Sequence, residues 1–156
     1  MKMRKKTFET NSSSSHSLVI AKTPKRDQII NSDEFVITPG EYGWEFDSFY
    51  SPEEKASYIL TDAINNLEKL DGGKEEFDRG INALKDFLGK EVIFKTDEGG
   101  EYWKDGYVDH QSSLCEDDDH TGIFDKQPNG LFKFDTERFV DFVFSSDCHF
   151  STGNDN

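Results

Sequence analysis

The sequence predicts an α+β fold, a mainly antiparallel sheet with two or three helices packed on one face. Two helical patterns follow one another in the middle of the chain, and short β-type runs flank them on both sides. The 14 Phe, 5 Tyr and 2 Trp among 156 residues supply apolar surface for a core. This length suits one domain, so we expect a single domain over residues 1–156, with residues 1–16 as a flexible N-terminal segment.

The first predicted elements are strands. A polar segment over residues 11–17 leads into the β-type run Leu18-Val19-Ile20-Ala21, which Thr23-Pro24 ends. A second run covers residues 34–38 and stops at Pro39-Gly40. The aromatic residues Tyr42, Trp44 and Phe46 alternate after this stop, so we expect the second run to form a hairpin with them.

Two helices follow. Ser51-Pro52-Glu53-Glu54 is a strong helix start, because Ser51 can cap, proline suits the first helical position and Glu54 completes a capping box. Apolar residues then recur at helical spacing over 56–67, and Asp71-Gly72-Gly73 ends the pattern. A second helix over residues 74–88 carries one apolar face and stops at Gly89.

The last third of the chain returns to β-type sequence. Residues 91–95 read as a strand, 97–100 as a turn and 101–109 as the returning strand of a hairpin. A loop is expected over 110–129, and a short strand over 132–134. The aromatic pattern of residues 136–144 fits a helix or a strand, and we favour a helix.

Charge narrows the classes of function. The chain has 18 basic and 32 acidic residues, a net charge of -14, so phosphate backbones repel it and direct nucleic-acid binding is not expected. Residues 1–26 carry +6 and the remainder -20. Such a dipolar molecule suits docking on a basic protein partner, although a solvated surface that keeps a small protein soluble is the plainer explanation.

The sequence also bears on the compartment. No apolar run approaches the roughly 20 residues of a membrane-spanning helix, so no membrane association is expected. The basic start is not followed by the apolar core of a signal peptide, and two cysteines do not make a disulfide scaffold. We therefore expect a cytoplasmic protein.

Thiol and imidazole side chains fall in polar, turn-like sequence. A zinc ion bound there would cross-link loops that a small hydrophobic core does not hold in place. No finger-type spacing is present, and free thiols and surface histidines are the alternative. With four protein ligands the zinc would be structural. Three ligands and a water, with Asp109 or Glu116 as base, would instead suit a small metal-dependent hydrolase or nucleotide-processing enzyme. The candidate ligands are His16, His110, Cys115, His120 and Cys148.

One resemblance is specific. The opening Lys6-Thr7-Phe8-Glu9-Thr10-Asn11-Ser12-Ser13-Ser14-Ser15-His16-Ser17 resembles that of a family of uncharacterised proteins from phages and mobile elements of Gram-positive bacteria. Val108-Asp109-His110-Gln111-Ser112 and Gly153-Asn154-Asp155-Asn156 also resemble that family. The resemblance covers about a fifth of the chain and implies a phage-related origin without an established catalytic role. It slightly favours His16 and His110 as site residues.

In size and charge the chain is also similar to anti-CRISPR inhibitors of type II CRISPR-Cas nucleases, some of which bind metal. That similarity implies a non-enzymatic inhibitor whose partner is a basic nucleic-acid-binding protein, a CRISPR-Cas effector nuclease, because such nucleases hold nucleic acid in positive channels. Eight carboxylates concentrated within 23 residues are the predicted docking residues: Asp97, Glu98, Glu101, Asp105, Glu116, Asp117, Asp118 and Asp119.

Overall fold

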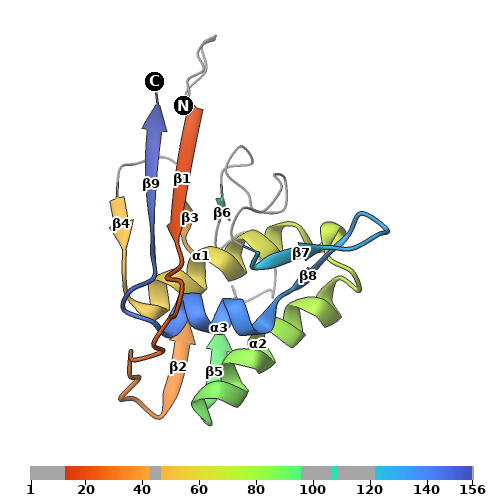
Figure 1. Ribbon diagram of the computed structural model, residues 1–156. Coiled ribbons are helices and arrows are strands. Elements are labelled where there is room, and N and C mark those ends of the chain that lie inside the picture. The colour runs from red at the N-terminus through yellow and green to blue at the C-terminus, as the bar shows by residue number, and fades with distance from the viewer. Residues whose placement is uncertain (1–12, 43–46, 96–106, 109–121, 156) are drawn as a thin grey trace.

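The computed structural model describes residues 13–42, 47–95, 107–108 and 122–155 (Figure 1). It has the predicted α+β architecture, with three α-helices and several small sheets. In chain order the elements are β1 (Ser13–Val19), β2 (Glu34–Ile37), β3 (Glu41–Tyr42), β4 (Asp47–Phe49), α1 (Pro52–Asn65), the 3₁₀ turn η1 (Leu67–Lys69), α2 (Lys74–Leu88), β5 (Glu91–Phe94), β6 (Tyr107–Val108), β7 (Phe124–Lys126), β8 (Phe132–Phe134), α3 (Thr136–Phe144) and β9 (His149–Asp155).

The largest sheet is antiparallel, with the strand order β1-β9-β4. Its register places Leu18 and Phe49 on either side of Phe150, which is fully buried and stacks on Tyr58 of α1 at 4.3 Å between ring centroids. In the neighbouring row Val19 pairs with His149, and Tyr50 follows the last residue of β4. Val19 and Tyr50 are exposed. One face of the sheet therefore packs on α1, as the alternation of strand side chains requires.

The two predicted hairpins are wrong within the described residues. β2 pairs with β5 and β3 pairs with β6, both in parallel, whereas residues 43–46 and 96–106 of the expected hairpins lie outside the description. Parallel neighbours need a long crossover connection, and α1 with α2 supplies it between β2 and β5. The alternation of apolar and polar residues predicted which residues are extended, but it did not predict which strands pair with each other.

Most helix ends follow the sequence closely, but α1 ends at Asn65, before the predicted stop at residues 71–73, and the 3₁₀ turn η1 follows it. Ser51 Oγ accepts from the Glu54 N–H at 3.2 Å, which is the N-cap half of the predicted capping box, and donates to Glu54 Oε1 at 2.9 Å. α2 spans the predicted residues 74–88, and Gly89 ends it with φ of 65°. Residues 136–144 form a helix, as favoured, because the Asp135 carboxylate accepts from the Arg138 N–H at 3.1 Å and caps its start.

Phenylalanine dominates the core, as the composition predicted. The buried rings of Phe124 and Phe139 lie 5.0 and 5.1 Å from that of Phe134, between their centroids, and α1 is buried on nearly every side. The helices lie together below the upper ends of β1 and β9 in Figure 1. In the part of the chain that is described, no helix has the length and apolar character needed to span a membrane.

Gly80 of α2 provides a test of this packing. A Cβ on Gly80 would lie 2.7 Å from Cε2 of Phe134, whose ring is held between two other buried rings. We predict that Gly80→Ala lowers the free energy of unfolding by about 1–2 kcal/mol, because the overlap outweighs the gain in helix propensity of about 1 kcal/mol. Urea unfolding measures the change.

Asn82→Ala, at an exposed position of the same helix, is the matched control and should be neutral or slightly stabilising. Equal effects of the two substitutions would contradict the close approach of α2 to Phe134.

Candidate functional site

The eight predicted docking carboxylates lie in residues 96–106 and 109–121, outside the described residues. These two segments together contain nine acidic residues and one lysine, a net charge of -8. The short strand β6 joins them, and its parallel pairing with β3 attaches it to the fold beside buried Tyr42. Both acidic segments are therefore tethered to the same point of the fold.

A smaller group of carboxylates lies within the described part. Asp33, Glu34 and Glu53 line an open hollow of about 510 Å³ together with Ser32 and Val36. The three acidic side chains come from the start of β2 and the first turn of α1, and all are exposed. They add negative potential to this surface without forming a site on their own.

The predicted zinc ligands are placed only in part. His110, Cys115 and His120 lie outside the described residues, and of His16 the structure gives only the strand position opposite Thr152. Among the described residues, no group of three or more His, Cys, Asp or Glu side chains is arranged to hold a metal ion. The zinc site remains a prediction.

Cys148 is the one predicted ligand whose side chain is described. It is fully buried, and burial raises the pKa of its thiol, so the proton stays on at neutral pH. Zinc requires the thiolate. Its neighbour His149 pairs with Val19, three strand residues from His16, which is about 10 Å along the sheet. A zinc ion near His16 would therefore lie far from this thiol.

The turn from α3 to β9 is held by a buried lysine. The Lys55 ammonium, on the first turn of α1, donates to the carbonyl oxygens of Ser145 and Cys148 at 2.9 and 2.8 Å, and to Gln28 Oε1 at 2.8 Å. Three acceptors match the three donors of the ammonium group. Burial nevertheless lowers the pKa of Lys55 from 10.5 to about 8. This group joins three distant segments of the chain.

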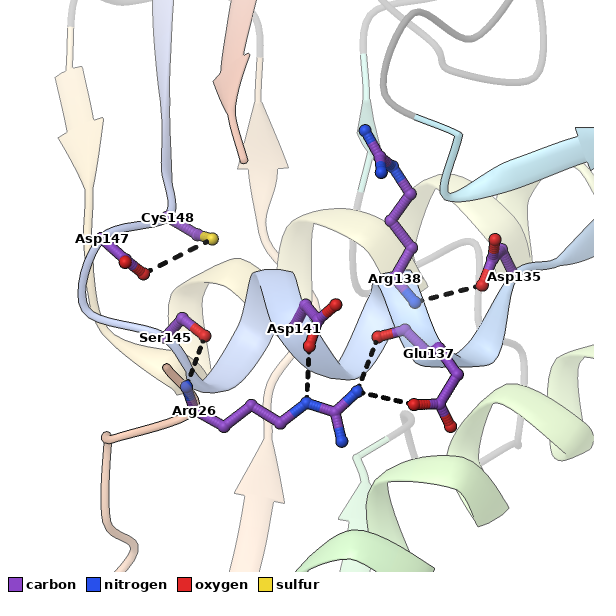
Figure 2. Close-up of polar contacts among 8 residues, drawn as sticks. All are labelled: Arg26, Asp135, Glu137, Arg138, Asp141, Ser145, Asp147 and Cys148. Atoms are coloured by element: carbon purple, nitrogen blue, oxygen red, sulfur yellow. Dashed lines mark hydrogen bonds and ion pairs between the residues drawn. The ribbon is translucent and has the colours of Figure 1, made fainter. Parts of the chain in front are cut away.

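Arg26 and Asp27 attach the N-terminal segment to the same region. The Arg26 guanidinium bonds to Asp141 at 2.5 Å and to the Glu137 carboxylate at 2.9 Å, and its backbone N–H donates to Ser145 Oγ (Figure 2). Asp27 accepts from the N–H and O–H of Ser146, which lowers the pKa of its carboxyl group. The network is structural, since each charge has its partner.

A groove of about 420 Å³ runs between α2 and α3. Arg26 and Arg79 line it, with Phe87 and Val140 among its apolar residues and Asp86 among its acidic ones. Glu76 neutralises Arg79 through two hydrogen bonds of 3.0 and 2.8 Å, as Asp141 and Glu137 do Arg26. Neither arginine is therefore an uncompensated charge that would attract an anion.

Sequence reasoning missed these polar groups. Lys55 follows a capping box, where a lysine normally lies on the solvent side, and Arg26 lies after a predicted strand end with no pattern around it. Apart from Gln28, which is 27 residues from Lys55, their partners are about 90 to 120 residues away in the chain. The only local signal was the small polar cluster Ser145-Ser146-Asp147 after the third helix.

Comparison with known proteins gives no relative: no known protein family matches the chain, and no curated protein or solved structure is significantly similar to it.

The Lys55 contacts predict a specific loss of stability. Lys55→Met removes all three hydrogen bonds of the ammonium, including those to the carbonyls of Ser145 and Cys148 in the buried turn, and among the described residues the Ser145 carbonyl keeps only the Cys148 N–H at 3.0 Å, so the free energy of unfolding should fall by about 3 kcal/mol. Lys133→Met, at an exposed position of β8, should change it by less than about 0.5 kcal/mol. Denaturant unfolding at pH 7 measures both.

The pH dependence has a definite sign. Between pH 8 and 10.5 the unfolded chain holds more protons at Lys55 than the folded protein, so titration of this group raises the free energy of unfolding as pH rises. Lys55→Met lacks this contribution, and the stability gap between wild type and variant should widen over this range. A constant gap would contradict the lowered pKa of Lys55.

Proposed function

We propose that the protein is a phage-derived, non-enzymatic inhibitor that binds a basic nucleic-acid-binding protein, a type II CRISPR-Cas nuclease, and blocks nucleic-acid loading or cleavage. The supporting observation is the joining of two segments with a net charge of -8 at one short strand, β6. Chain connectivity keeps the start of one acidic segment close to the end of the other, so their carboxylates act on one region of a partner.

The physical basis is competition for a positive channel. Cas nucleases hold the guide–target duplex and the displaced strand with lysine and arginine side chains. A cluster of carboxylates meets the same cations, and complementary charge speeds encounter. The Debye length is only about 8 Å at physiological salt, so charge steers the partner while contacts at the interface hold it.

The test is a DNA-cleavage assay with purified type II nucleases. Reversal of the run Glu116, Asp117, Asp118 and Asp119 to lysine should weaken inhibition at least about tenfold, because the introduced cations face a cationic surface. Reversal of Asp33, Glu34, Glu68 and Asp125 changes the net charge equally and should leave most of the inhibition. If both variants lose inhibition equally, net charge alone explains the effect. If the variant with residues 116–119 reversed inhibits as well as the wild type, the proposed interface is wrong.

We also propose a structural zinc ion held by side chains of the predicted set, above all His110, Cys115 and His120, which share one acidic loop sequence at spacings of five residues. Thiolate and imidazole are ligands that zinc prefers, and neighbouring carboxylates favour a dication. A structural ion would brace the segment that carries four of the docking carboxylates.

Elemental analysis of the gently purified protein tests the zinc proposal. We expect about one zinc per chain, lost in Cys115→Ala and His120→Ala and retained in Cys148→Ala, because the Cys148 side chain is fully buried in the core. A preparation that contains no metal would contradict the zinc proposal. Loss of zinc in Cys148→Ala would show that this thiol is a ligand.

A further inference from the structure

Strand β1 forms one edge of the antiparallel sheet (Figure 1). It pairs with β9 over seven consecutive residues, from Ser13 opposite Asp155 to Val19 opposite His149, without a bulge. In the described ranges, no strand pairs with its other edge. An extended strand with an unpaired side presents backbone N–H and C=O groups to another strand.

β1 lacks the features that usually protect such an edge. Natural edge strands are kept from pairing by lysine, proline, bulges or short length. The sequence of β1 is Ser-Ser-Ser-His-Ser-Leu-Val, with no proline and, with histidine neutral, no formal charge. The opposite edge is different, because β4 has three residues and begins with Asp47. The contrast singles out β1 as the edge able to accept a strand.

We propose that β1 of a second copy of this chain pairs antiparallel with this edge. The two sheets then form one six-stranded sheet across a two-fold axis, with the order β4-β9-β1 in one copy continuing as β1-β9-β4 in the other. Full overlap of the seven residues gives the largest number of hydrogen bonds. It places His16 opposite His16 of the partner subunit, and Ser15 opposite Ser17 of the partner subunit.

Charge favours a second copy over a strand of the basic target. Two molecules of net charge -14 repel each other, but an uncharged β1 lets them meet where neither strand presents carboxylates. An edge made to receive a basic strand would carry acidic residues, and β1 has none. Dimerisation does not depend on the identity of the inhibited partner.

Sedimentation equilibrium of the full chain tests the proposal. We expect a concentration-dependent dimer of the wild type. The double substitution Ser15→Lys and Ser17→Lys places lysines opposite lysines at two pairs of positions and should raise the dimer Kd at least about tenfold. Ser48→Lys, on the opposite edge strand β4, is the matched control and should leave the Kd unchanged.

A charge-swap pair separates edge pairing from misfolding. The double substitution Ser15→Glu and Ser17→Glu should also be monomeric alone, but an equimolar mixture with the lysine variant should form a heterodimer, because opposite charges then face each other. A wild type that stays monomeric up to roughly 100 μM, an undiminished dimer of the lysine variant, or no heterodimer in the mixture would each overturn the proposal.

Discussion

The buried Lys55 ammonium is the interaction on which the arrangement of the chain ends depends. It lies on the first turn of the most buried helix and donates to the turn that connects α3 to β9 and to the segment that follows β1. β1 and β9 begin or end close to these contacts. Since three acceptors satisfy all three N–H groups, the ammonium is held in place despite its desolvation, and the antiparallel sheet is fixed relative to α1.

In this fold the aromatic residues that pack in the interior lie in other segments of the chain than the proposed docking carboxylates. Aromatic rings from all three helices and from β9 form the interior, and the carboxylates with partners, such as Asp27, Asp141 and Glu76, hold basic groups or backbone N–H groups. The acidic segments 96–106 and 109–121 join the fold through the two-residue strand β6. The carboxylates that hold these contacts are therefore not among the proposed docking carboxylates.

The proposed inhibitor and the proposed dimer use different parts of the molecule. The acidic segments adjoin β6, which pairs with β3, whereas β1 lies at the edge of a separate sheet. A dimer through β1 would present two sets of acidic segments, and two linked sites raise the effective concentration of the second once the first has bound. Charge and backbone pairing would thus serve two separate contacts.

The sequence by itself determined the local elements. The N-cap at Ser51, the apolar face of α2 and its end at Gly89 rest on side chains within a few residues of one another, and the structure agrees with them. The aromatic content of the core was predictable from composition alone. The acidity of the molecule and the run of carboxylates were also readable without a structure. The candidate docking and zinc residues remain sequence predictions, apart from Cys148, whose burial is now known.

Only the tertiary structure decided which strands pair and which polar groups are buried. β2 lies beside β5 and not beside its neighbour in the chain, Lys55 is internal, and Arg26 meets Asp141 across 115 residues. The physical reason is that alternation and helical spacing describe the faces of single elements. Parallel pairing and the satisfaction of a buried charge depend instead on segments that meet only after the chain has folded.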